Sequence, residues 1–338
     1  MLNSTISLAQ DEITLDGPAG PPPEGVIPNF VNPPNKTDLS YAITTICLAI
    51  TTFLVVTRLY AKTYCTKDVH IPDFLSFIAF GIYCGYAYAL YDCIHGSGFL
   101  IDIWNYQQKD LPKYLYPNYI ITILYPLVLA FLKSAILLDW CRILVPLGTR
   151  NRFWWICHVL VVFNVVFYVT MFFGWTFSCD PVERYWKIYG PGKCVNLLVL
   201  DVINGGFNLT TDLIAFFLPQ QVIWSLNMPI KRCIGVSAIF AIGLLACIIA
   251  TLRIPYVVQM YSSNNLTYDL SSLDLWNFGE MTCGFIVLCV PSSIIVYTRF
   301  KSWLGSIPSN ERDIEGKNKD PYDSSTLTGS SSTRELWV

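Results

Sequence analysis

Seven long apolar segments constrain this chain more than any other feature of its sequence. Each approaches or exceeds the roughly 20 residues that an α-helix needs to span a bilayer. Only 14% of the residues are charged, whereas a soluble domain typically has about 25%, so a large soluble core is excluded. The sequence therefore predicts an all-α membrane protein, a seven-transmembrane helix bundle with segments near 39–61, 73–93, 116–143, 153–175, 196–225, 232–257 and 273–298.

The ends of the chain differ from this apolar middle. Residues 1–38 are polar and rich in proline, and residues 301–338 are polar and rich in serine and threonine. Neither stretch has enough apolar surface to fold by itself, so we expect disordered tails on either side of a transmembrane domain at 39–300. Met1 to Gln10 lacks the basic and apolar regions of a signal peptide.

Lysine and arginine residues near the segment ends indicate the orientation. Ten lie on the side reached after the first segment and six on the opposite side. The positive-inside rule therefore predicts an outer N-terminus and a cytoplasmic C-terminus. We expect a multi-pass protein of the plasma membrane, with the lipid bilayer as a partner. The net charge of −2 gives no basic surface for nucleic acid.

Glycosylation sequons and cysteines agree with this orientation. Asn3, Asn35 and Asn265 each begin a sequon on the predicted outer side, and we expect glycans there. A further sequon at Asn208 lies inside an apolar segment and is read as coincidence. Of the twelve cysteines, most lie in apolar segments and are expected to pack as small apolar residues.

One outer loop is expected to contain a disulfide. Cys179 and Cys194 flank "DPVERYWKIYGPGK", on the side of the membrane where the environment is oxidising. A bond between them would close the loop over the outer end of the bundle. Cys93, at the outer end of the second segment, is a competing partner.

Two charges deep in the bilayer are expected to pair. Lys133 follows Tyr116 by 17 residues and Asp212 follows Asn196 by 16, which at 1.5 Å per residue puts both at about 25 Å from the outer end. An ionisable group at that depth is costly unless it is paired. We therefore predict an ion pair between Lys133 and Asp212. A structural role is the simpler interpretation, and a latch broken on activation is the alternative.

Two further charged layers are predicted. Near the outer face, Asp201, Arg253 and Glu280 have similar depths, and they would form either the floor of an outer pocket or an interfacial salt bridge. At the cytoplasmic end of the third segment, Asp139 and Arg142 are three residues apart and are expected to pair on one helix face. That pair would be either a solvated helix end or an inner lock.

Six stretches of the sequence occur in a recognisable order. They are "TRLYAK" (57–62), "LKSAILLDWCRIL" (132–144), "CDPVERYW…GKC" (179–194), "NLTTDLIAFFLPQQVIWSL" (208–226), "GLLACIIATLRI" (243–254) and "LWNFGEMTCGFIVLCVPS" (275–292). Together they resemble the fungal rhodopsin-domain family, which includes receptor-like surface sensors of filamentous fungi. This chain has "IPDF" where the family often has paired aspartates, and it has no Cys-rich domain before the bundle. The resemblance covers about 39–305, it adds Trp276 to the candidate outer pocket, and it points to Lys133, Arg142, Trp186, Asp212, Pro219, Arg253, Trp276 and Glu280.

The resemblance implies a receptor-like signal sensor, with an unknown extracellular ligand and a cytoplasmic signalling partner. Segment 273–298 contains no lysine, so the usual attachment of retinal is absent and we expect no cofactor. A small-molecule transporter is the alternative, because Pro219-Gln220 resembles the motif of small carriers, but the second copy that such carriers contain is missing. Three histidines and no Gly-x-Ser-x-Gly sequence argue against a metal site and against an enzyme.

Overall fold

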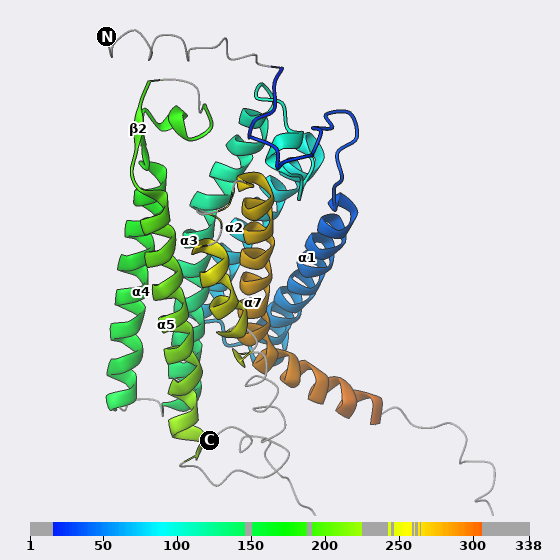
Figure 1. Cartoon of the computed structure of the whole chain (residues 1–338). Helices are drawn as coiled ribbons and strands as arrows, with labels where there is room; N and C mark the ends of the chain where they lie inside the picture. Colours follow the sequence, from blue (N-terminus) through cyan, green and yellow to red (C-terminus); the bar gives the residue numbers. More distant parts are fainter. Residues whose placement is uncertain are drawn as a thin grey trace, which may run out of the picture.

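The chain folds as an all-α membrane protein (Figure 1). The computed structural model describes residues 16–145, 151–187, 191–224, 243–244, 247–258, 260, 263 and 265–305. Six helices in this part of the chain are long and apolar enough to cross a membrane, and a shorter apolar helix covers Cys247–Val258. The six are α1 (Thr37–Tyr60), α2 (Ile71–Ser97), α3 (Leu111–Leu144), α4 (Arg152–Thr176), α5 (Leu197–Trp224) and α7 (Leu266–Gly305).

Short elements join these helices. A π-helical turn, η1, extends α1, and it ends at Lys67, whose φ of 54° reverses the chain before α2. Two 3₁₀ turns and a two-stranded antiparallel ribbon lie at the opposite end of the bundle, which we call the outer end. Their bounds are η1 (Ala61–Thr66), η2 (Ile103–Asn105), β1 (Cys179–Asp180), η3 (Val182–Tyr185) and β2 (Lys193–Cys194).

Helix α3 is central to the packing, because it contacts α2, α4, α5 and α7. Aromatic stacking joins α2 to α7, with the rings of Tyr83 and Phe278 4.6 Å apart. Gly284 of α7 lies against Leu132 of α3, where an added Cβ would approach the leucine to 2.7 Å. The absence of a side chain at Gly284 therefore lets α3 and α7 come close together.

Large apolar side chains cover the outside of the bundle. On α1, Phe53 is 70% exposed, and on α4, Val162 and Phe163 are 63% and 65% exposed. In water such a surface would be unfavourable, but in hydrocarbon it is not, because lipid tails are as apolar as these side chains. The inward faces hold the polar residues, as a membrane bundle requires.

The helix positions predicted from the sequence are confirmed, with changes at their ends. Helix α7 begins at Leu266 rather than near residue 273, since seven further residues continue the helix above the membrane segment. Pro126 stays inside a continuous α3, which also includes Pro117. The segment predicted at 232–257 is described only from residue 243, so its first part lies outside the described residues.

The N-terminal tail is not wholly disordered, contrary to the prediction. The Ala19 amide donates to the Tyr106 carbonyl at 2.8 Å, and the Gln108 amide donates to the Gly17 carbonyl at 3.0 Å. The Asn29 amide donates to Asn105 Oδ1 at 3.0 Å. Residues 16–36 therefore lie over the loop between α2 and α3, because backbone pairing supplies the stabilisation that their composition does not. Residues 1–15 and 306–338 lie outside the described residues.

Candidate functional site

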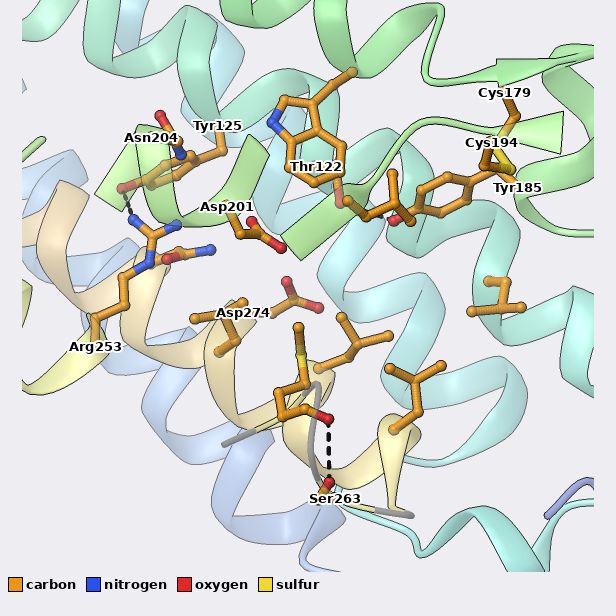
Figure 2. Close-up of a pocket in the computed structure, with 18 of the residues that line it drawn as sticks. Thr122, Tyr125, Cys179, Tyr185, Cys194, Asp201, Asn204, Arg253, Ser263 and Asp274 are labelled. Carbon is orange, nitrogen blue, oxygen red and sulfur yellow. Dashed lines mark hydrogen bonds between the residues drawn. A yellow bond between two sulfur atoms is a disulfide. The ribbon is translucent and has the colours of Figure 1, made fainter. Parts of the chain in front are cut away.

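A cavity of about 410 Å3 opens between the outer ends of α3, α5, α7 and the helix Cys247–Val258. One part of its wall is apolar and the other is polar and charged (Figure 2). We call it the outer cavity. Its apolar lining includes Leu115, Trp175, Leu197, Met260, Leu270 and Leu273, and its polar lining includes Thr122, Tyr125, Arg184, Tyr185, Asp201, Asn204, Arg253, Asp274 and Asn277.

A disulfide-closed loop forms the outer rim of the cavity. Cys179 and Cys194 are bonded to each other and are directly opposite in the β1–β2 ribbon. Cys93, the competing partner, has a free thiol that donates to the Tyr114 carbonyl at 3.8 Å. The loop brings Tyr185 of η3 inward, where its hydroxyl lies 3.4 Å from Asn118 Oδ1. Burial raises the pKa of Tyr185, so the phenol is neutral at physiological pH.

Several polar atoms that line the cavity lack partners within the described part of the chain. Arg253 Nε, Asn204 Oδ1 and Asn277 Oδ1 are buried and have no hydrogen-bond partner. Asn204 and Arg253 are each 2% exposed, and Asn277 is 6% exposed. Buried polar groups are almost always hydrogen-bonded to protein or to ordered water, so these atoms can bind water or a ligand in the cavity.

The floor of the cavity is a charged group shared by three helices. Arg253 Nη1 donates to the hydroxyl of Tyr125, which in turn donates to Glu280 Oε2 at 2.9 Å. Arg253 Nη1 lies 3.7 Å from the same carboxylate oxygen. The predicted outer layer thus contains Arg253 and Glu280 in an ion pair, with Asp201 in the wall above them. Of this charged group, Arg253 and Tyr125 line the cavity, and Glu280 lies behind them, outside the lining.

Further polar and charged side chains lie between this group and the inner half of the bundle. Asn208 Nδ2 donates to Glu280 Oε1, and Lys133 Nζ donates to Asn208 Oδ1 at 2.5 Å. Lys133 Nζ also lies 2.6 Å from Asp212 Oδ1, so the structure contains the predicted ion pair. The lysine donates further to Thr211 Oγ1 at 2.9 Å, and its ammonium group lies 5.9 Å from the ring centre of Tyr168.

These contacts form one unbroken series of hydrogen bonds, which we call the polar chain: Arg253, Tyr125, Glu280, Asn208, Lys133 and Asp212. It runs from the wall of the outer cavity into the inner half of the bundle. It joins the helix Cys247–Val258 to α3, α5 and α7. Its members are in direct contact with one another from the outer cavity to the inner half.

A separate group of charges lies near the inner end, and it includes Asp139. Arg58 Nη2 lies 2.7 Å from Asp73 Oδ1, and Arg58 Nη1 lies 3.1 Å from Asp139 Oδ2. Arg58 Nη1 also donates to the Leu288 carbonyl at 2.5 Å. Arg58 is only 2% exposed, and two buried carboxylates and one backbone oxygen balance its charge. We call Arg58, Asp73 and Asp139 the inner charge cluster.

The predicted pairing of Asp139 with Arg142 is wrong. Asp139 faces the bundle and binds Arg58, while Arg142 points outward and binds Asp68, in the turn between η1 and α2. Residues three apart share a helix face only approximately. A fully buried guanidinium such as that of Arg58 attracts Asp139 more strongly than the half-buried one of Arg142 does. The two residues therefore connect α3 to two different elements.

Other predicted residues lie away from the cavity. Trp276 does not line it, because its ring faces Tyr256 at 6.3 Å. Trp186 packs against Tyr116 and Tyr119, with ring centres 5.3 Å apart in each case. The side chain of Pro219 lies outside the described residues.

The sequon asparagines differ from one another. Asn35 is exposed, and Asn3 lies outside the described residues. Asn265 is not the free acceptor that was expected, since its Nδ2 donates to Asp102 Oδ1 at 2.6 Å and its Oδ1 accepts from the Ile103 amide at 3.0 Å. Asn265 thus ties the start of α7 to the α2–α3 loop, and a glycan on Nδ2 would disturb that contact.

Helical spacing points to Asn204, Asn208, Asp274 and Asn277, which are not among the site residues predicted from the sequence. Asp201, Asn204, Asn208 and Asp212 are three or four residues apart and so lie along one face of α5. Asp274 and Asn277 do the same on α7, together with Glu280. Asn208 begins a sequon inside an apolar segment, and Arg58 lies at the end of the first apolar segment, so neither residue stands out as a site residue in the sequence. Asn118, Tyr125 and Asp68 give no comparable signal in the sequence, whereas Asp73 is the aspartate of the "IPDF" stretch.

The sequence matches the fungal rhodopsin domain over residues 57–299. The chain belongs to the fungal rhodopsin domain family. The match contains every residue of the polar chain and of the inner charge cluster. No solved structure matches this member of the family.

Curated relatives of this fungal rhodopsin domain protein come from filamentous fungi. A protein of Gibberella zeae named fugralins biosynthesis cluster protein 2 is 39% identical over 82% of this chain and 70% of its own length. A SAT4 family membrane protein of Emericella nidulans is 29% identical over 62% of this chain. Wortmanamides biosynthesis cluster protein C of Talaromyces wortmannii is 24% identical over 58% of this chain. The matched regions span 53% and 56% of the latter two relatives.

Proposed function

We propose that this protein is a receptor-like sensor of the plasma membrane that binds a small molecule in the outer cavity, without retinal. The observation that carries the proposal is the polar chain, which begins at the cavity wall and ends in the inner half. A ligand that contacts Arg253 changes the electrostatic balance at Glu280, and Asn208 links that carboxylate to Lys133. A cytoplasmic partner would read the resulting change at the inner end.

Coupling of this kind needs a ligand that interacts differently with two arrangements of the helices. The unpartnered atoms Arg253 Nε, Asn204 Oδ1 and Asn277 Oδ1 provide the differential contact, because they gain hydrogen bonds only when the cavity is filled. Their helices are the ones that the polar chain joins. The proposal is therefore a ligand-dependent repacking of α5 and α7 against α3.

The names of two relatives support a small molecule as the ligand. The relatives are named for the biosynthesis clusters of fugralins and wortmanamides. A sensor associated with such a cluster would respond to a product or a precursor of the pathway. The size of the cavity agrees, because sites for drug-sized molecules typically occupy about 300–1,000 Å3.

The test uses the purified full chain in lipid nanodiscs and a library of small organic fragments of positive, neutral and negative charge. Fragments that raise the melting temperature are then examined by hydrogen exchange. We expect binding to slow exchange around the cavity and also in the inner half of α5, near Asp212. Asn208→Ser should keep the binding and lose the change near Asp212. Stabilising fragments whose effect stops at the cavity would contradict the proposed coupling.

A carrier is the second candidate, and the biosynthesis-cluster names of two relatives favour it as well. A membrane protein beside a biosynthetic pathway could move the product across the bilayer instead of sensing it. The fragments found above distinguish the two roles when they are offered to sealed proteoliposomes. Saturable uptake that requires the protein would replace the receptor proposal with a carrier, and binding without uptake would support the receptor.

A further inference from the structure

We propose that the outer cavity binds an organic cation, a molecule with a protonated amine and an apolar body, and that Asp201 and Asp274 hold the amine. This inference rests on the proposed function and specifies the ligand of that site. Figure 2 shows the two carboxyl groups directed toward each other across the cavity, Asp201 from α5 and Asp274 from α7. An ammonium group between them would contact both.

The charges around the cavity favour a cation. Asp274 accepts a hydrogen bond from Asn118 Nδ2 at 2.8 Å, and this neutral amide orients the carboxyl group. Arg253 is offset from below by Glu280, and its Nη1 is already engaged by Tyr125. Arg184 at the rim donates to the Lys187 carbonyl at 3.3 Å. The guanidinium groups near the cavity are thus each engaged by other groups, and Asp201 and Asp274 are the acidic residues of the cavity lining itself.

The unpartnered oxygens of the cavity point to the same class of ligand. Asn204 Oδ1 and Asn277 Oδ1 are acceptors, and each belongs to a side chain that is more than nine-tenths buried. A protonated primary amine has three N–H donors and no acceptor. It can therefore satisfy a carboxylate and an amide oxygen together, whereas an anion would face the lone pairs of both. The remaining donor, Arg253 Nε, suits a hydroxyl or carbonyl oxygen of the same ligand.

The rest of the wall fits an apolar body. Leu115, Leu197, Leu270 and Leu273 line the cavity, and Trp175 adds an aromatic surface. Burying such a body is favourable because its apolar surface is removed from water. Within the described residues, no group of three or more histidine, cysteine or acidic residues could hold a metal ion, and this agrees with an organic cation rather than a metal ion as the occupant.

The experiment uses three probes of one shape and different charge. They are phenethylamine, its neutral analogue 2-phenylethanol, and its anionic analogue 3-phenylpropionate, each added to the purified full chain in nanodiscs at pH 7. Affinity is measured by titration calorimetry and by the shift in melting temperature. We expect phenethylamine to bind at least about tenfold more tightly than either analogue, since a hydrogen bond to a charged group contributes about 1.5–3 kcal/mol.

Two variants locate the amine. Asp274→Asn and Asp201→Asn should each weaken phenethylamine binding about tenfold or more and leave 2-phenylethanol binding nearly unchanged. Glu183→Gln is the matched control, because Glu183 is an exposed acid of the same outer loop, paired with Lys187; it should bind phenethylamine as the wild type does. If one aspartate variant does not fold, the other still decides the question.

The outcomes separate this inference from the proposed function. Preferred binding of 3-phenylpropionate, with loss in Arg253→Gln, would overturn the amine ligand and leave a small-molecule sensor standing. Equal binding of all three probes, or binding of none, would also overturn the amine ligand. Tight amine binding that requires Asp274, without any change in hydrogen exchange near Asp212, would retain the amine site and overturn the coupling.

Discussion

Lys133 depends on several acceptors rather than on a single carboxylate. Asp212, Asn208 and Thr211 all lie within hydrogen-bonding distance of its ammonium group. Removal of one member of a buried ion pair typically costs about 3–5 kcal/mol, because the other charge is left unpaired. We expect Lys133→Ala to lower the melting temperature of the detergent-solubilised protein clearly, and the double variant with Asp212→Ala to recover part of that loss.

Strictly additive losses in the two single variants and the double variant would refute energetic pairing of Lys133 with Asp212. Lys113→Ala is the control, since Lys113 pairs with Asp110 at the surface, where its side chain is 71% exposed. Exposed pairs contribute about 0–1 kcal/mol. The control variant should therefore melt within a degree or two of the wild type.

The two arginines of the inner end, Arg58 and Arg142, should differ sharply in how much they contribute to stability. Arg58 binds two buried carboxylates and a backbone oxygen, while Arg142 pairs with Asp68 at the surface. Arg58→Lys cannot reproduce the forked contacts of a guanidinium, so we expect lower thermal stability and less monodisperse protein in size-exclusion chromatography. Arg142→Ala should lose about 1 kcal/mol or less. Equal losses of stability in the two variants would show that burial does not determine how much each arginine contributes to stability.

At the scale of single residues, the sequence predicts how deep a charged residue lies in the membrane better than it predicts which way its side chain turns. Lys133 and Asp212 were matched because the fixed rise of a helix places them at one level. The partner of Asp139 was not predictable in the same way, since it depends on how α1 packs against α3 and on which side chain becomes buried. Arg58 lies at the end of an apolar segment, where an arginine ordinarily reaches the lipid headgroups. Tertiary packing instead turns it inward.

Among the elements, the loop between α4 and α5 depends most on a single bond. The disulfide joins residues 15 apart, and closing a loop of that length contributes about 3 kcal/mol in the chain-entropy model. We expect Cys179→Ser with Cys194→Ser to lower the melting temperature and weaken ligand binding in the outer cavity. A maleimide reagent should label both cysteines only after reduction. The matched control Cys93→Ser should keep the binding, since Cys93 is not bonded.

The helices themselves followed from the sequence, because a run of about 20 apolar residues has few alternatives in a bilayer. Their ends did not. Helix α7 extends past its apolar part at the outer end because Asn265 and Thr267 bond to the loop before α3. Composition alone made residues 16–36 a disordered tail, yet they pair with that same loop. In both cases long-range hydrogen bonds, made by side chains at α7 and by the backbone at residues 16–36, decide the outcome, and composition does not encode them.

At the scale of the whole molecule, the direction of insertion is still a prediction from the positive-inside rule, and the sequons test it. If the N-terminus is outside, glycans can be added at Asn35, which is exposed, and at Asn3. Expression in a glycosylating fungal host should give a band that moves faster after endoglycosidase treatment. The double variant Asn3→Gln, Asn35→Gln should abolish that shift, and a band unaffected by the enzyme in the wild type would argue for the opposite orientation.

Asn265→Gln provides the internal comparison for that experiment, because the same orientation places Asn265 outside as well. Its side-chain amide is engaged by Asp102 and by the Ile103 amide, and Thr267 of the same sequon is fully buried, with its hydroxyl donating to the Ile101 carbonyl. A glycan there would have to break the contact that anchors α7. We therefore expect Asn265→Gln to leave the glycan shift unchanged and to lower the melting temperature, whereas loss of a glycan without loss of stability would mean that Asn265 is an acceptor and not an anchor.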